Sequence, residues 1–514
     1  MAQLFTRKPL ELLLKEMAGD HRLRRVLGPI QLTSLGVGAI IGTGIFVLTG
    51  VAAHERAGPA MILSFVVAGF ACALAALCYA EFASMAPVAG SAYTYAYATL
   101  GELLAWIIGW DLVLEYAVTA GAVAHGASHY FQDLIGIFNL HLPDSLTDAP
   151  FDYNAALGRF VSTGRFLDLP AMIIVSAVTV VLVIGIRESA SFNTAMVILK
   201  VAIVIFVIAV GAFYINTANW HPFAPYGYTG INFFGNTLFG QSDKGGQPLG
   251  MLAGAAIIFF AYIGFDSVST HSEEARHPER DVPIGIIASL LICTTLYMGV
   301  GAVLTGMVPY NTIDINAPVS GAFKQVGLTW AQLVISAGAL IGITSVVLVT
   351  MLSQARILLA MARDGLLPTS FFGDVHPKFR TPWKSTIVTG IFAALLSSLL
   401  PLRLLSDLVN IGTLLAFVIV CAAVLIMRRT HPDAPRPFRA PLVPLVPIVG
   451  ILTCLLLMFS LPPENWLRLG GWLVIGFVIY FGYGRRHSVM SRYLKKEITE
   501  HGVSPAGAQM SDTL

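Results

Sequence analysis

The chain has 514 residues, of which 56% are hydrophobic and only 12% are charged, and its formal net charge is +2. Soluble domains carry about 25% charged residues, so this composition excludes a soluble globular protein and indicates one that crosses a membrane several times. The small net charge gives no indication of nucleic-acid binding. The five cysteines lie singly inside apolar runs, so we predict no disulfide framework and no metal site, and we expect no cofactor.

Twelve segments are apolar and long enough to span a bilayer, which takes about 20 residues. They are 30–50, 59–82, 100–133, 168–186, 193–216, 250–271, 284–308, 330–360, 384–402, 405–427, 442–461 and 467–484. The third and eighth segments are long, so we expect them to be tilted or to extend beyond the bilayer. The sequence therefore predicts an all-α integral membrane protein with twelve transmembrane helices.

The basic residues indicate the orientation, because cytosolic loops collect lysine and arginine. With the N-terminus inside, 23 of the 31 basic residues fall in cytosolic segments, seven fall in outer loops, and the last, Lys200, lies inside a span. We therefore expect a multi-pass protein of the cell membrane with both termini in the cytosol. The longest outer loops are 134–166 and 217–249, and neither contains a recognisable catalytic spacing.

The first span contains the stretch 36–46, which has four glycines within nine residues. Each glycine in a helix costs about 1 kcal/mol relative to alanine, so this stretch predicts an interruption of the helix. At membrane depth the freed backbone groups are tolerated only where they line a cavity or pack against protein. The amides that begin the second half-helix would attract a carboxylate, as in secondary transporters. The alternative is a face of small residues for close helix packing.

The sixth span becomes polar at Asp266, and the region of Gly264 is a second predicted interruption. It lies five spans after the first, so two five-span halves would have opposite orientations in the membrane. Matching interruptions in inverted halves indicate a transporter site at the bilayer midplane, which favours the cavity over the packing alternative. The predicted organisation is a cytosolic segment 1–29, a repeat 30–216, an extracellular loop 217–249, an inverted repeat 250–427, helices 11 and 12 within 428–484, and a cytosolic tail 485–514.

Several separate motifs resemble one known family. The stretch 38–46 resembles the first-helix signature of the amino acid–polyamine–organocation (APC) superfamily, and 259–266 resembles its sixth helix. The runs 273–286 and 360–368 resemble the loops after its helices six and eight, and 109–116 indicates the cationic amino acid transporter (CAT) branch in its bacterial form. The resemblance implies a leucine-transporter-type fold, in which a 5+5 inverted repeat with broken helices 1 and 6 is followed by two further helices.

The resemblance also implies a binding site for an amino acid between the two interruptions. The α-carboxylate would be bound by the amides of Gly42, Thr43 and Gly44. The α-ammonium would be bound by the backbone carbonyls of Ile40, Ile41, Phe260, Ala261 and Ile263, and the Phe260 ring would act as a gate. The candidates for the side-chain pocket are Val118, Thr119 and Thr344, and these small or apolar residues favour neutral over cationic amino acids.

Three ionisable residues inside the spans are candidates for proton coupling, because a buried charge in a membrane marks a functional site by default. The resemblance implies that Lys200 reaches the first interruption and stands where sodium-coupled relatives hold a cation, which favours protons over sodium. The alternative is that Lys200, about seven residues from the start of its span, extends to the inner surface. Glu115 and Asp266 are the other two candidates. Their alternatives are a structural hydrogen bond for Glu115 and an N-cap of the second half-helix for Asp266.

These features predict a proton-coupled amino acid importer that works by alternating access. Spans one, two, six and seven would move against spans three, four, eight and nine, and the partners would be an amino acid, a proton and the lipid bilayer. An amino acid exchanger of the same fold is the nearest alternative. A channel is less favoured, because the spans carry isolated buried charges and no continuous polar stripe. An enzyme is not expected, because the spans hold no recognisable metal or nucleophile spacing.

Overall fold

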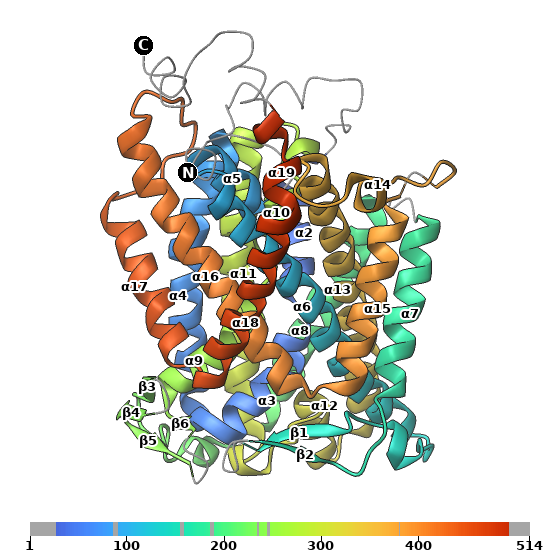
Figure 1. Ribbon diagram of the computed structural model, residues 1–514. Coiled ribbons are helices and arrows are strands. Elements are labelled where there is room, and N and C mark those ends of the chain that lie inside the picture. Colours follow the sequence, from blue (N-terminus) through green and yellow to red (C-terminus); the bar gives the residue numbers. More distant parts are fainter. Residues whose placement is uncertain are drawn as a thin grey trace, which may run out of the picture.

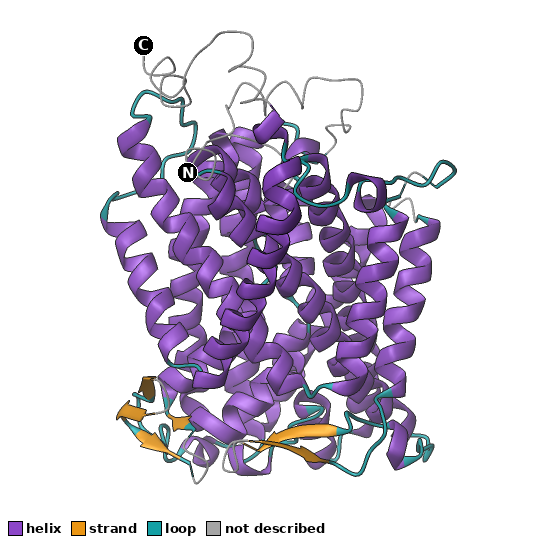
Figure 2. Cartoon of the chain, viewed as in Figure 1, coloured by secondary structure: helices purple, strands orange, loops and turns teal. Residues whose placement is uncertain are grey.

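The computed structural model describes residues 27–85, 91–154, 159–185, 190–233, 236–243, 247–379 and 381–492. Most of the predicted N-terminal segment and the end of the predicted tail lie outside these residues. The described chain forms a bundle of long helices that run roughly side by side, with short β-hairpins gathered at one end (Figures 1 and 2). We call this end the hairpin end. The helices α5, α14 and α19 lie at the opposite end (Figure 1).

The helices follow the predicted spans closely. In chain order they are α2 (Pro29–Ile40), η2 (Gly44–Leu48), α3 (Thr49–Ala52), η3 (Ala53–Ala57), η4 (Gly58–Ala60), α4 (Met61–Met85), α5 (Ser91–Thr99), α6 (Glu102–Gly136), η5 (Asp144–Leu146), α7 (Leu169–Ile184), α8 (Ala190–Gly211), η6 (Ala212–Tyr214), η7 (Thr217–Trp220), α9 (Met251–Ile258), η8 (Phe259–Tyr262), α10 (Ser267–Thr270), η9 (Ser272–Glu274), α11 (Pro278–Met307), η10 (Tyr310–Thr312), α12 (Pro318–Gln325), α13 (Thr329–Arg363), α14 (Thr369–Phe372), α15 (Trp383–Leu399), α16 (Leu402–Thr430), α17 (Leu445–Phe459), α18 (Pro463–Ile479), η11 (Tyr480–Gly484) and α19 (Arg485–His487). Each of the twelve predicted segments thus contains helix.

Eight helices of the described chain are long and apolar enough to cross a membrane, and four apolar helices are shorter. The long third and eighth predicted segments are the 35-residue helices α6 and α13. The shorter four are α2, α7, α15 and α17. The first two predicted spans are joined without a loop, because the chain stays helical through η3 and η4 and turns at Gly58, whose φ is +59°. The fold is that of a largely helical, multi-pass membrane protein.

The two longest predicted outer loops contain β-structure that the sequence analysis did not predict. Strand β1 (Phe151–Asn154) pairs antiparallel with β2 (Arg159–Ser162), β3 (Ile231–Phe233) with β4 (Asn236–Phe239), and β5 (Gln241–Ser242) with β6 (Pro248–Leu249). Each hairpin is short and lies beyond the end of the helices (Figure 2). The hairpins therefore cover one end of the bundle and leave its helical core unchanged.

The helices pack in two groups. In the first, α11 packs against α2 and α4, and α4 packs against α9. In the second, α6 packs along α13, and α15 packs against α6 and α7. The first group holds the predicted spans one, two, six and seven, and the second holds spans three, four, eight and nine. We call them the bundle group and the scaffold group. Helix α8 contacts both groups, because it packs against α2 as well as α13.

Candidate functional site

The first span is interrupted at the glycines. Helix α2 ends at Ile40, Ile41 is extended with φ −72° and ψ 101°, and helical structure resumes at Gly44. Among the described residues, neither the Gly42 nor the Thr43 amide donates to a main-chain acceptor. A buried amide without a partner costs free energy, so these two N–H groups form a ready donor pair for an anion.

The sixth span is interrupted at the level of Gly264. Helix α9 ends at Ile258, the 3₁₀ turn η8 follows, Ile263 is extended, and α10 begins only at Ser267. Gly264 has φ +112°, a conformation that residues with a side chain rarely adopt. A Cβ atom at this position would also lie 2.9 Å from the carbonyl oxygen of Ala39. The glycine therefore allows the second interruption to lie directly against the end of α2.

The two interruptions are in contact at a second point as well. A Cβ atom on Gly44 would lie 2.3 Å from the Cα atom of Ala261, so only glycine fits there without a shift of the backbone. The hydroxyl of Tyr297 on α11 lies 2.9 Å from the carbonyl oxygen of Ile40 and 3.0 Å from that of Ala261. One hydroxyl group links both broken helices, and the sequence analysis did not single it out.

These contacts divide the five carbonyls that were predicted to bind an ammonium group. Those of Ile40 and Ala261 already face Tyr297, and that of Phe260 accepts from the Ile263 amide at 3.2 Å. Among the described residues, the carbonyls of Ile41 and Ile263 accept no hydrogen bond. Since a carbonyl oxygen has two lone pairs, the first three keep partial capacity, whereas the last two are fully available.

Lys200 on α8 reaches the first interruption. Its side chain is 2% exposed, and its Nζ donates to the carbonyl oxygen of Gly38 at 2.6 Å. Gly342 on α13 leaves room for the aliphatic part of the Lys200 side chain, because a Cβ atom on Gly342 would lie 3.1 Å from Lys200 Cγ. The alternative in which Lys200 extends to a membrane surface is therefore wrong. Gly38 lies in the last turns of α2, where the helix dipole favours a positive charge.

A second polar group lies where α6 meets the sixth span. The hydroxyl of Tyr116 donates to Asp266 Oδ2 at 2.8 Å. Asp266 is the N-cap residue of α10, the position that the capping alternative expects, although its side chain makes no capping hydrogen bond to that helix. Glu115 is 2% exposed, and neither of its carboxylate oxygens has a hydrogen-bond partner among the described residues. Burying an ionised carboxylate without a hydrogen-bond donor costs free energy. The surroundings of Glu115 therefore suit a carboxyl group that holds a proton or binds a water molecule.

The predicted side-chain pocket residues lie in different settings. Thr119 on α6 is 5% exposed, and its hydroxyl has no hydrogen-bond partner within the described chain. It lies one helical turn from Val123, whose carbonyl oxygen accepts a hydrogen bond from Thr43 Oγ1 at 3.2 Å. Thr119 is therefore close to the first interruption. Val118 is fully buried on the same helix. On α13 the residue next to Gly42 is Val346.

Thr344 lies two positions earlier than Val346, which is about 200° round the helix, and its side chain is half-buried. Val346 therefore replaces it as the α13 residue beside the interruption.

A cavity of about 200 Å³ opens at the hairpin end. It reaches Leu48 and Ile257, each four residues, or about one helical turn, from the contact between Gly44 and Ala261. At the opposite end, Arg356 of α13 lies 3.7 Å from the Glu274 carboxylate and 3.0 Å from His271 Nε2. The cavity thus lies on the hairpin side of the interruptions, and the Arg356 contacts join the two groups at the opposite end.

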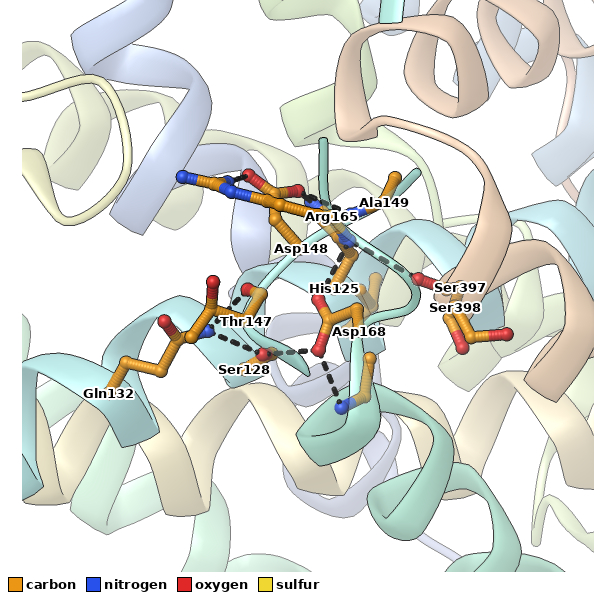
Figure 3. Close-up of polar contacts among 12 residues, drawn as sticks. His125, Ser128, Gln132, Thr147, Asp148, Ala149, Arg165, Asp168, Ser397 and Ser398 are labelled. Carbon is orange, nitrogen blue, oxygen red and sulfur yellow. Dashed lines mark hydrogen bonds and ion pairs between the residues drawn. The ribbon is translucent and has the colours of Figure 1, made fainter. Parts of the chain in front are cut away.

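The wall of this cavity contains a histidine cluster that the sequence analysis missed. His125 and His129 lie one turn apart on α6, and Asp148 lies in the loop before β1 (Figure 3 labels His125 and Asp148). Burial alone would raise the pKa of the Asp148 carboxyl, but the hydrogen bond and charge of His125 hold that pKa well below its usual value. The spacing of two histidines four residues apart on a predicted span was the available signal.

Comparison with known proteins identifies the family. The sequence matches the family model "Amino acid permease" over residues 27–482. It is 45% identical over 492 residues to the methylthioribose transporter of Bacillus subtilis (strain 168), covering 96% of this chain and 100% of that protein. It is 46% identical over 490 residues to the branched-chain amino acid permease BcaP of the same organism, covering 95% and 99%. It is 39% identical over 418 residues to the vacuolar cationic amino acid transporter 4 of Arabidopsis thaliana, covering 81% and 65%.

These matches confirm the predicted resemblance to APC-type permeases and to the CAT branch, and they indicate a transporter and not an enzyme. The family match spans the helices that carry both interruptions and Lys200. Together with the membrane-length helices, it makes amino acid transport the general activity. The chain therefore belongs to the amino acid permease family.

Proposed function

We propose that the protein is a secondary active transporter that carries neutral L-amino acids into the cell together with protons. The observation that carries the proposal is the meeting of two interrupted helices beside a buried amine, Lys200. Transporters of this general design bind their substrate where discontinuous helices meet near the bilayer midplane. The proposed topology is the twelve-span arrangement with a 5+5 inverted repeat.

Within the described chain, the unpaired main-chain groups at the two interruptions suit a zwitterion. The Gly42 and Thr43 amides, with Gly44 beginning the second half-helix, provide donors and a positive dipole end for the α-carboxylate. The carbonyls of Ile41 and Ile263 provide acceptors for the α-ammonium. Donors and acceptors come from the backbone, so this part of the site is independent of the substrate side chain.

The residues near the interruptions favour an uncharged side chain. Val118, Val346 and Phe260 are buried and apolar, and Thr119 adds one hydroxyl. A cationic side chain would need an acidic partner, and burial of an unpaired charge is costly. The two relatives that the chain matches over almost their whole length are named for methylthioribose and for branched-chain amino acids, neither of which has a charged side chain, whereas the Arabidopsis thaliana relative is named for cationic amino acids. We therefore favour neutral amino acids over cationic ones.

Lys200 is the proposed coupling residue. As an ammonium it stabilises the carbonyl end of α2 through Gly38, and loss of its proton removes this charge–dipole attraction. Proton exchange at Lys200 would therefore change how firmly α2 is held against α8. Glu115 and Asp266 are the proposed second proton site, because both carboxyls are buried, Asp266 within the sixth span and Glu115 on α6 next to Tyr116, which donates to Asp266.

Alternating access follows from the two helix groups. We place the hairpin end outside and both termini in the cytosol, from the distribution of basic residues. The cavity would then admit substrate from outside, and the Arg356 contacts would close the cytosolic side. Movement of the bundle group against the scaffold group would close the first and open the second.

The test uses purified protein in liposomes. A thermal-shift screen against the twenty L-amino acids and methylthioribose identifies the ligand, and uptake of that ligand is then measured with an inward proton gradient. We expect accumulation by the native protein, and loss of accumulation with retained binding in Lys200→Ala. Lys324→Ala, which changes an exposed lysine on α12, is the matched control. Full accumulation by Lys200→Ala would contradict the coupling role, and counterflow without net accumulation would favour an exchanger.

A further inference from the structure

The cluster of His125, His129 and Asp148 has the donor atoms of a transition-metal site. One ligand atom from each of the three residues lies within 4.8 Å of the other two. Two imidazoles with one carboxylate are a common ligand set for Zn²⁺, with a water in the fourth position. Tetrahedral bonds of about 2.05 Å place neighbouring ligand atoms about 3.3 Å apart. His125 Nε2 lies 3.2 Å from Asp148 Oδ1, and a bound Zn²⁺ would replace the ion pair between them as the imidazole gives up its Nε2 proton.

His129 supplies an independent indication of a ligand. Its side chain is 9% exposed, yet neither ring nitrogen has a hydrogen-bond partner among the described residues. Its ring centroid lies 4.7 Å from that of His125, and both residues line the cavity. A buried imidazole without a partner loses the hydrogen bonds that it made in water. A metal ion bound between the two rings would restore a partner for it.

The ring of His125 is held in place through the nitrogen that would not bind the metal, as in most metal-binding histidines. Its Nδ1 lies 3.0 Å from Asp168 Oδ2 and 3.2 Å from the Ser397 carbonyl oxygen, which leaves Nε2 to face Asp148 (Figure 3). Asp168 is fully buried, and its other oxygen accepts from Ser128 Oγ at 2.6 Å. A carboxylate behind the imidazole fixes the ring and increases the electron density on the nitrogen that binds metal.

The Asp148 carboxylate has other partners, with which a metal ion would have to share it. Arg165 forms an ion pair with its Oδ2, and the Ala149 amide donates to its Oδ1 at 2.8 Å. Arg165 is 39% exposed and is free to move aside. The cavity wall adds the acidic residues Glu55, Asp152 and Asp407 against one arginine, Arg403. This excess of carboxyl groups favours entry of a cation.

We propose that His125, His129 and Asp148 bind one Zn²⁺ ion at the wall of the hairpin-end cavity, with Asp168 as the residue that positions His125. The ion ties the loop before β1 to helix α6 and occupies space through which the cavity is entered. External Zn²⁺ therefore inhibits uptake. The inhibition rests on the proposed transport function, whereas the binding of the metal does not.

Binding is measured by titration calorimetry of Zn²⁺ into the full-length, tag-free protein, with the ligands identified by X-ray absorption at the zinc edge. We expect one equivalent of Zn²⁺ and Zn–N distances of about 2.0–2.1 Å. His129→Gln should remove this site, and Asp168→Asn, which keeps the cap on α7, should weaken it about 10- to 100-fold. His141→Ala, an exposed histidine that follows α6, is the matched control.

A thermal melt without metal establishes that each variant folds. His129→Gln should melt like the native protein, because the imidazole that it removes has no partner among the described residues. Unchanged Zn²⁺ affinity in His129→Gln, or no saturable binding by the native protein, would overturn the proposal. Zinc binding without inhibition of uptake would leave the site intact and would refute only its effect on transport.

Discussion

Gly44→Ala tests the contact between the two interrupted helices with a single methyl group. The added Cβ would lie 2.3 Å from Ala261 Cα and 2.6 Å from Ala261 Cβ. Carbon atoms in contact are normally about 3.5–4.0 Å apart, so the two helices must separate by more than 1 Å. Ala261 cannot retreat easily, because Asn410 on α16 donates to the Ala256 carbonyl at 2.9 Å and holds the preceding turn of α9.

Overpacking of this kind costs about 1–3 kcal/mol, and the gain from replacing a helical glycine offsets at most about 1 kcal/mol of it. The same separation moves the amides of the first interruption away from the carbonyls of the second. A loss of about 1.4–2.8 kcal/mol in binding corresponds to about 10- to 100-fold weaker affinity. We therefore expect a lower melting temperature together with weaker binding of the amino acid.

The assay is a thermal melt of purified protein at increasing concentrations of the ligand found in the screen. Gly471→Ala is the matched control, since a Cβ on Gly471 of α18 would meet nothing within 4 Å. We expect this control to be neutral or slightly stabilising. If Gly44→Ala melts and binds like the native protein, the two interruptions do not form the contact on which the proposed site depends.

Three further substitutions probe the same framework by thermal melting. Tyr297→Phe removes the hydroxyl that links the two broken helices and should cost about 1–2 kcal/mol, whereas Tyr228→Phe, at an exposed residue, should change nothing. Gly264→Ala should cost about 1–3 kcal/mol because of its positive φ, and a native-like melt would contradict that conformation. Glu81→Ala should cost about 3 kcal/mol, because the guanidinium of Arg428, which donates to the Glu81 carboxylate at 2.7 and 2.8 Å, loses its charged partner and keeps, among the described residues, only the Ala440 carbonyl at 3.3 Å. A change below about 1 kcal/mol would mean that this pair behaves as a surface ion pair.

The sequence could predict both interruptions because their causes are local. Four glycines near Gly42 and a turn to polar residues after Gly264 weaken a helix wherever it lies. Lys200 could be singled out as a candidate for a similar reason, since one charge in an apolar run is visible without a structure. The choice between a contact with the first interruption and a position at the surface needed the fold, because it depends on how α8 lies against α2.

Other parts of the site depend on contacts between distant segments. The sequence does not reveal that Tyr297 faces the carbonyls of Ile40 and Ala261, because buried tyrosines are common in spans and the register between α11 and α2 is set by packing. Thr344 stays a prediction for the side-chain pocket, but it lies about 200° round α13 from Val346, the residue beside Gly42, and the sequence does not set this helical phase. The position of Asp148 beside the α6 histidines follows from the path of a loop, which periodicity does not predict.

The distribution of contacts explains why Lys200 is a suitable coupling residue. Within the bundle group, the interruptions are joined by steric contact at Gly44 and by the Tyr297 hydroxyl, so they are suited to move as one body.

Between the first span and the helices beside it, the described contacts include single hydrogen bonds from Thr43 to the Val123 carbonyl, from Tyr130 to the Phe46 carbonyl and from Lys200 to the Gly38 carbonyl. The two hydroxyl groups stay neutral near pH 7. Lys200 is the one of these three groups that carries a charge, and its ammonium loses that charge when it gives up a proton. Proton transfer at Lys200 would therefore alter one attachment of the first span and leave the proposed substrate-binding backbone groups in place, and this separation of roles is what the proposed coupling requires.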